Sequence, residues 1–422
     1  MIPTRILIIS DTHAQLPLPA KEMSPVPFHH PLPSADVLIH CGDLTLNGKL
    51  SQHEAAVELL TSATADLKIV VPGNHDITLD RDYYRRFPDK HADYGPYSEQ
   101  TLDGIRELYT SPQAKEAGIR YLEEGVAGFE LRNGARLTVY ASAYQPAFCN
   151  WAFGYPRSID RFNLRQEGGG EPENPVPDHG DIDIMITHGP PKGILDKVWR
   201  GEDVGGQNVG CKHLRYAVER CRPRIHCFGH IHEAWGAVMK RWDAGDVVGP
   251  EQVCTTGDPP SSTFAGDGTG RWEDKPKNGS AAKSVAGLGP LHSTTTESRR
   301  QPKKVQEEGE PEILPSVSNL AASSKSSPIP PYHPSTNPSS YYMYPHQLQQ
   351  HNNAGETLLL PDPYDDQVRR KCMAVDGGGL NFGRETLFVN ASIVNLRYRP
   401  MNAPWVVDVM LPEAAEGGGR RH

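Results

Sequence analysis

Cysteine is scarce in this sequence, and a long apolar run is missing from its start. The 422 residues include 7 cysteines with no Cys-x-x-Cys pair, so neither a disulfide framework nor a zinc knuckle is indicated. A reducing compartment suits such a chain. The apolar stretch Ile6–Ile9 ends at Ser10 and is shorter than a signal peptide or a membrane span requires. We therefore expect a cytoplasmic protein with no membrane contact.

An excess of basic residues is missing as well. The chain has 43 Lys and Arg against 52 Asp and Glu, which gives a formal net charge of −9. This balance does not favour binding to a phosphate backbone, so nucleic acid is not expected as a partner. Apolar residues make up only 37%, whereas roughly 45–50% is usual. Part of the chain is therefore expected to form no packed core.

Short β-branched runs alternate with helical patterns in the first part of the chain. Strands are predicted at Arg5–Ser10, Asp36–His40, Leu67–Val71, Leu137–Ala141, Asp183–Thr187 and Arg224–Phe228, and helices at Gln52–Thr61 and Cys211–Cys221. Continuous apolar runs of this length are typical of strands that are buried on both faces. The pattern predicts an α/β fold.

The composition changes after about residue 240. Residues 241–372 are rich in Ser and Pro and predict a low-complexity, disordered insertion. Strand composition returns in Glu385–Tyr398 and Trp405–Met410, so residues 373–412 are expected to complete the domain that residues 1–240 begin. Residues 413–422 are predicted to form a flexible tail. The insertion could bind protein partners, although its basic run Arg299–Lys304 is more typical of a solvated linker.

Polar side chains follow five of the predicted strands. Apart from His75, which also follows a strand, they are Asp11, His13, Asp43, Asn74, His188, His230 and His232. Ligand sites in open α/β sheets lie at the carboxyl ends of strands, so these segments can converge. Seven such ligands are too many for one tetrahedral ion but suit two ions that share one carboxylate. Imidazole and carboxylate ligands accept Mn, Fe, Zn, Co or Ni.

Several histidines and aromatic residues have more than one interpretation. Any ligand candidate alone could be a turn or strand-end residue, and only their joint occurrence favours a site. His40 and His226 lie inside predicted strands and are expected in the core. The aromatic loop with Trp151, Phe153 and Tyr155 is either a packed surface loop or a wall that stacks a nucleobase.

The order of these motifs resembles the calcineurin-like metallophosphoesterase superfamily. The motifs stand as Asp11-Thr12-His13, Gly42-Asp43, Gly73-Asn74-His75-Asp76, Thr187-His188 and Gly229-His230-Ile231-His232. The segments ILIISDTH, VVPGNHD and CFGHIHEAWG are similar in sequence to those of the metallophosphoesterase-domain-containing proteins of the fetal-brain type, with fungal-type insertions. The resemblance covers residues 4–239 and 385–410. It implies a four-layer α/β/β/α sandwich.

The resemblance also implies a role for each matching residue. Asp11, His13 and His232 would hold one divalent ion, Asn74, His188 and His230 would hold the second, and Asp43 would bridge them. His75 would protonate the leaving oxygen or stabilise the phosphate charge, and Asp76 would orient its ring. Asn74, His75, Trp151 and Phe153 are the expected substrate contacts. Asn390 would have a supporting role.

The function that follows is hydrolysis of a small phosphodiester, such as a cyclic nucleotide, by a hydroxide that bridges the two ions. This step rests on similar members of the superfamily. A phosphomonoesterase or protein phosphatase shares the same motifs. A nucleotide-binding scaffold with little turnover is the alternative from another class.

Overall fold

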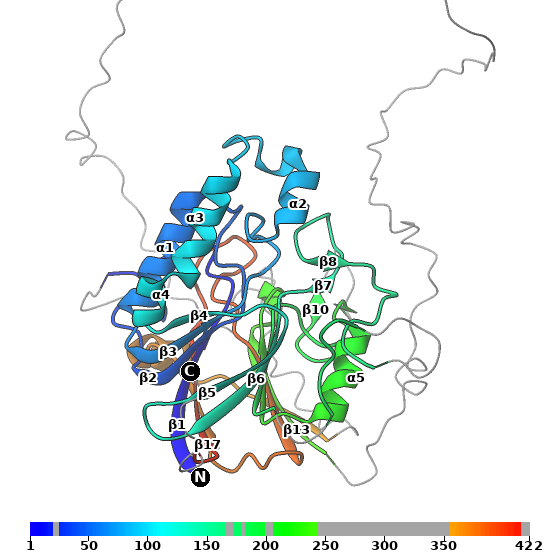
Figure 1. Ribbon diagram of the computed structural model, residues 1–422. Coiled ribbons are helices and arrows are strands. Elements are labelled where there is room, and N and C mark those ends of the chain that lie inside the picture. The colour runs from blue at the N-terminus through cyan, green and yellow to red at the C-terminus, as the bar shows by residue number, and fades with distance from the viewer. Residues whose placement is uncertain (20–24, 165–171, 179–181, 199–205, 243–354, 415–422) are drawn as a thin grey trace, which may run out of the picture. The chain divides into compact units, whose positions relative to one another are not determined.

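The computed structural model describes residues 1–19, 25–164, 172–178, 182–198, 206–242 and 355–414, and all of them belong to one compact unit (Figure 1). The predicted insertion falls largely on residues 243–354, which lie outside the described residues, as do Arg299–Lys304 and the tail from residue 415 onward. Among the described residues, no helix has both the length and the apolar character needed to cross a membrane.

The first sheet has six strands in the order β15-β17-β1-β2-β3-β4. These strands are β1 (Ile2–Ile9), β2 (Ala35–His40), β3 (Ala65–Val70), β4 (Ile119–Tyr121), β15 (Met373–Gly377) and β17 (Trp405–Leu411). β1 to β4 run parallel to one another, whereas β17 pairs antiparallel with β1, with Ile6 opposite Val407. Ile6, Leu7, Ile8 and Ile9 are at most 1% exposed, as expected for a strand covered on both faces.

The second sheet has seven strands in the order β14-β13-β16-β12-β9-β6-β5. These strands are β5 (Gly125–Glu130), β6 (Arg136–Ser142), β9 (Ile184–Thr187), β12 (Ile225–Phe228), β13 (Gly236–Arg241), β14 (Glu356–Leu359) and β16 (Glu385–Asn390). Its central strands β6, β9, β12 and β16 are parallel. Along β9, Ile184 and Ile186 join the core that both sheets share, and Met185 joins a smaller core with α5 residues.

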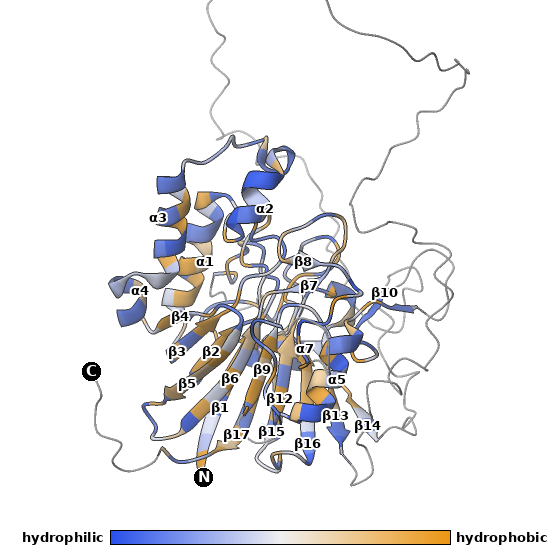
Figure 2. Cartoon of the chain, turned by 45° about the vertical axis from the view of Figure 1, so that its right-hand side comes forward, coloured by the Kyte–Doolittle hydropathy of each residue, from blue (hydrophilic) through white to orange (hydrophobic). Residues whose placement is uncertain are grey.

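Helices lie on the outer side of each sheet, which gives the four layers α/β/β/α (Figure 1). Their bounds are α1 (Leu50–Ser62), α2 (Arg81–Arg86), α3 (Glu99–Thr110), α4 (Pro112–Glu116), α5 (Lys212–Cys221) and α7 (Tyr364–Arg370). Short elements also occur among the described residues: 3₁₀ helices at Pro88–His91 and His232–Ala234, and strands β7 (Gln145–Pro146), β8 (Gly154–Tyr155), β10 (Lys197–Val198) and β11 (Gln207–Asn208). Figure 2 shows apolar residues concentrated on the strands and polar residues on the outer helices. The predicted fold class is confirmed.

One predicted boundary is wrong. Residues 355–372 fall within the predicted insertion, yet they contain β14 and α7. β14 pairs antiparallel with β13, with Val238 opposite Leu358, and Gln367 of α7 is 2% exposed. A four-residue edge strand is too short to change the average composition of its surroundings, which is why the sequence pattern missed it.

Candidate metal centre

The candidate ligands follow the carboxyl ends of five parallel strands, as predicted. Asp11 and His13 follow β1, Asp43 follows β2, and Asn74 follows β3 in the first sheet. His188 follows β9, and His230 and His232 follow β12 in the second sheet. The strand ends of both sheets therefore supply the site.

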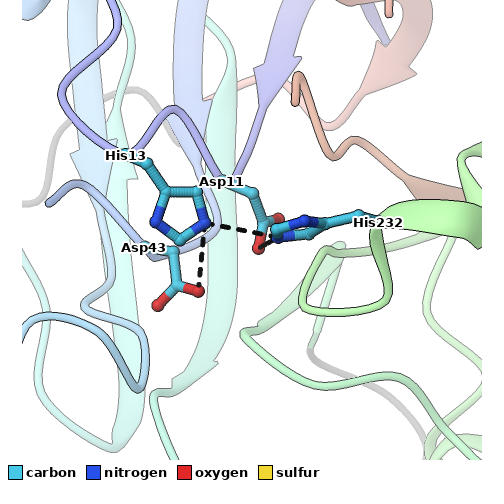
Figure 3. Close-up of side chains that lie close together, drawn as sticks. All are labelled: Asp11, His13, Asp43 and His232. Atoms are coloured by element: carbon cyan, nitrogen blue, oxygen red, sulfur yellow. Dashed lines mark hydrogen bonds and ion pairs between the residues drawn. The ribbon is translucent and has the colours of Figure 1, made fainter. Parts of the chain in front are cut away.

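A first group of ligand atoms comes from Asp11, His13, Asp43 and His232, all within 4.8 Å of one another (Figure 3). His13 Nε2 lies 3.6 Å from Asp43 Oδ2 and 3.3 Å from His232 Nε2. His232 Nε2 lies 3.3 Å from Asp11 Oδ1. These distances between ligand atoms suit coordination of one cation at their centre.

A second group comes from Asp43, His188 and His230 within the same 4.8 Å limit. His188 Nε2 lies 3.4 Å from Asp43 Oδ1 and 2.9 Å from Asn74 Oδ1. Asp43 therefore directs one carboxylate oxygen toward each group. This is the arrangement that a bridging ligand between two cations requires.

The hydrogen bonds behind the ligands fix which ring nitrogen faces the site. His13 Nδ1 lies 3.0 Å from Thr45 O, and His188 Nδ1 lies 3.0 Å from Cys41 O. A carbonyl oxygen only accepts, so each Nδ1 carries a proton and each ring directs its Nε2 inward. Once Nε2 is deprotonated, imidazole nitrogens and carboxylate oxygens face one another, and this ligand set fits divalent cations.

Burial and charge act in opposite directions on the histidine pKa values. Burial lowers the pKa of His13 and that of His230 to about 3, which leaves neutral rings that can bind a metal. Burial also opposes charge on His188, but the Asp43 carboxylate outweighs it and raises the pKa of His188 to about 9. A divalent cation next to Asp43 would take the place of that proton.

The backbone is strained at four of the ligands. Asp11, His13, Asp43 and His230 have φ values of +50°, +46°, +54° and +68°. Non-glycine residues rarely adopt this left-handed region, and where they do the surrounding structure must hold them there. Gly229 allows the close approach of β12 to β1, because a Cβ at this position would collide with the Asp11 carboxylate.

A network from the C-terminal strands supports Asp11. The Ser392 hydroxyl lies 3.0 Å from Asp11 Oδ2 and 2.9 Å from Asn390 Oδ1, and Asn390 Nδ2 donates to Ile231 O at 2.9 Å. Asn390 thus lies behind the site, where the resemblance implies a supporting role. Ser392 was not predicted, because a lone serine after a strand has no distinctive pattern.

His75 lies beside the ligands and points its ring into the same region. Its Nδ1 lies 2.6 Å from Leu46 O, and its ring centroid lies 4.7 Å from that of His13. The ring stacks on Trp151 with a centroid distance of 4.1 Å. Because the His75 Nδ1–H donates to Leu46 O, Nε2 is the ring atom that remains for a substrate.

The prediction that Asp76 orients the His75 ring is wrong. Asp76 is fully buried, and its carboxylate accepts hydrogen bonds from the backbone N–H groups of Gly73, Leu44 and Thr45 at 2.7, 3.2 and 2.8 Å. A buried carboxylate needs several donors, and these amides provide them. Asp76 therefore ties the loops after β2 and β3 together.

The residues of the aromatic loop lie in different surroundings: Trp151 is at the site, whereas Phe153 and Tyr155 are packed in the interior. Trp151 contacts His75, as described above. Phe153 is 8% exposed and packs edge-on against Tyr144, and the Tyr155 hydroxyl lies 3.1 Å from Cys211 Sγ. Core packing covers most of the Phe153 ring, and its contact with a substrate stays a prediction.

The two strand histidines lie in the core, as predicted. His40 is 1% exposed with its Nε2 2.9 Å from Thr12 Oγ1, and His226 is fully buried with its Nε2 2.9 Å from Thr187 Oγ1. Neither belongs to the two ligand groups.

Tyr398 is a site residue that the sequence analysis missed. Its ring centroid lies 4.8 Å from that of His13 and 5.6 Å from that of His232, nearly perpendicular to both. It belongs to the turn between β16 and β17, which carries no motif and follows no parallel strand end directly. Only the folded chain brings it to the ligands.

Comparison with known proteins agrees with this geometry. The chain belongs to the calcineurin-like phosphoesterase family, which matches residues 4–234. The human metallophosphoesterase domain-containing protein 1 is 33% identical over 259 residues, which cover 60% of this chain and 67% of the human protein. A UPF0046 protein of Caenorhabditis elegans is 31% identical over 56% of this chain and 65% of its own length. The family consists of metal-dependent phosphoric ester hydrolases that use two divalent ions.

Among solved structures, the purple acid phosphatase PPD1 of yellow lupin seeds aligns with 57% of this chain and 40% of its own length. The TM-score is 0.25 and the identity is 14%.

Proposed function

We propose that the protein hydrolyses a phosphodiester at a centre of two divalent metal ions. The observation that carries this proposal is Asp43, which contributes to both ligand groups. A pair of ions held there would lower the pKa of a water molecule and offset the charge of the phosphate.

The proposed roles follow the two groups. Asp11, His13 and His232 would hold one ion, and Asn74, His188 and His230 would hold the other. Mn, Fe, Zn, Co and Ni are all compatible with imidazole, amide and carboxylate ligands. The proposed substrate contacts are Asn74 and His75, and Trp151 would act through the His75 ring on which it stacks.

His75 is the proposed catalytic side chain. Its Nδ1–H donates a hydrogen bond to Leu46 O. Nε2 would therefore donate a proton to the leaving oxygen or stabilise negative charge on the phosphate. The stacked Trp151 ring and the Leu46 carbonyl together restrict how the imidazole can turn. Such restriction favours a fixed orientation toward the substrate.

The preference for a diester rests on the resemblance to family members that act on cyclic nucleotides and model diesters. The family assignment covers phosphomonoesterases as well. A cytoplasmic location, and protein partners for residues 241–372, also stay predictions from the sequence.

The test compares hydrolysis of bis-p-nitrophenyl phosphate and p-nitrophenyl phosphate by the full chain with Mn²⁺. We expect faster turnover of the diester. Asp43→Asn should lower the rate by more than about 100-fold, because even outer partners of metal ligands are worth about 10–100-fold. Asp82→Asn is the control, since the Asp82 side chain is fully exposed on α2.

Faster turnover of the monoester would show that the protein is a phosphomonoesterase and not a phosphodiesterase. Binding of mononucleotides without any turnover would favour a scaffold. Full activity of Asp43→Asn would rule out the proposed two-ion centre.

A further inference from the structure

Tyr398 stands next to the ligands of the first group without belonging to them. Its ring is edge-on to His13 and His232, with interplanar angles of 85° and 88°. Its centroid also lies 6.1 Å from that of His75. Three site histidines thus surround one tyrosine from the C-terminal part of the chain.

The turn that carries Tyr398 is held in one conformation. The Asn395 side-chain oxygen accepts hydrogen bonds from the backbone N–H groups of Arg397 and Arg399 at 2.8 and 3.2 Å. Tyr398 N–H donates to Asn395 O at 2.8 Å. Tyr398 has a φ of +54°, in the same left-handed region as the strained ligands. An aromatic residue held there against its preference indicates that the position of its ring matters.

Much of the ring surface is available for a ligand. Tyr398 is 39% exposed, although its ring already makes T-shaped contacts with the buried His13 and the partly buried His232. By contrast, Trp151 has His75 stacked on its ring. Tyr398 therefore offers exposed aromatic surface next to the ligands of the first group.

We propose that Tyr398 is a substrate-contacting residue that binds a planar aromatic group of the phosphoester held at Asp43. It would thereby favour aryl and nucleoside esters over alkyl esters. This inference rests on the proposed function, because it requires a phosphoryl group between the two ligand groups. An aromatic group bound there would stack on the exposed surface of Tyr398 or meet it edge-on.

The test measures binding, so that turnover is not needed. Phenylphosphonate and methylphosphonate have a P–C bond in place of the ester linkage and differ only in the organic group. Isothermal titration of the Mn²⁺-loaded full chain with each should show tighter binding of phenylphosphonate. Tyr398→Ala should reduce that preference by about two- to tenfold, and Tyr398→Phe should keep it, because the ring makes the contact.

Leu396→Ala is the matched control, since Leu396 is 53% exposed on the same turn and should not affect the preference. The Mn²⁺ content of every variant is measured by elemental analysis. An unchanged preference in Tyr398→Ala would overturn the proposal. So would an equal loss for both phosphonates together with lost Mn²⁺, because the ring would then only support His13 and His232. If wild-type protein binds phenylphosphonate selectively but hydrolyses no ester, the proposed function fails while this contact stands.

Discussion

Ser392 lies 381 positions after Asp11 in the chain, yet its hydroxyl is 3.0 Å from the Asp11 carboxylate. The backbone holds the two segments together, because Ser10 N–H donates to Ala391 O at 2.9 Å and Ile393 N–H donates to Ser10 O at 2.8 Å. The segment after residue 354 therefore completes the site that the first 240 residues begin.

Removal of the Ser392 hydroxyl should weaken metal binding without unfolding the protein. Ser392→Ala leaves Asp11 Oδ2 without this donor, and loss of such an outer partner typically costs about 10–100-fold in metal affinity. Titration with Mn²⁺ followed by calorimetry measures the effect. Ser62→Ala, at the end of α1, should bind Mn²⁺ like wild type. Equal affinities for wild type and Ser392→Ala would show that the hydroxyl does not tune Asp11.

Two glycine substitutions should have opposite effects. Gly229→Ala places a methyl group against the Asp11 carboxylate and Ser10 Oγ, and it should destabilise the fold by about 1–3 kcal/mol and lower the Mn²⁺ content. Gly104→Ala lies in α3 with no atom within 4 Å of the new methyl group, and it should stabilise the fold by about 1 kcal/mol. Urea unfolding distinguishes the two. Normal Mn²⁺ content in Gly229→Ala would contradict the close packing of β12 on Asp11.

Residues 243–354 should be replaceable by a short linker. Arg241 N–H donates to Gly355 O at 3.1 Å, so the described residues that flank that stretch lie side by side at the β13–β14 pair. A few Gly and Ser residues can join them as a hairpin. We expect unchanged Mn²⁺ content and an unchanged thermal midpoint within a few degrees, measured by elemental analysis and circular dichroism. A chain that no longer folds would show that the removed residues are part of the domain.

The buried His53 should make stability depend on pH. It lies 2.8 Å from the Tyr109 hydroxyl and 2.7 Å from Thr78 Oγ1, and burial lowers its pKa to about 3. The unfolded chain binds a proton at this residue near pH 6.5. Stability from the neutral ring is therefore complete above pH 6.5 and is lost as the pH falls.

The measurement compares wild type with His53→Gln by urea unfolding in EDTA at pH 7.5 and 5.0. The wild-type advantage should shrink by about 2 kcal/mol at pH 5.0, since each pH unit below 6.5 costs about 1.4 kcal/mol. A difference that is the same at both pH values would show that His53 takes up no proton on unfolding.

The candidate ligands could be recognised in the sequence because each one comes shortly after a buried strand. Asp43 and His188 could therefore both be assigned to carboxyl ends of strands, although these strands belong to different sheets. The central strands could be predicted for the same reason, since burial on both faces requires continuous apolar runs.

The contacts around the ligands could not be predicted, because they depend on tertiary packing. Whether Asp76 faces His75 or the backbone amides of Gly73 and Thr45 depends on how two loops meet. Phe153 and Trp151 have similar chemistry and differ only in which one the core covers. Tyr398 reaches the site through a turn whose sequence resembles many others.

The most direct test of the two-ion centre is anomalous scattering from crystals of the full chain grown with Mn²⁺. We expect two anomalous peaks about 3.5–4 Å apart, one near Asp11, His13 and His232 and one near Asn74, His188 and His230, with Asp43 between them. A single peak, or manganese bound away from Asp43, would contradict the account.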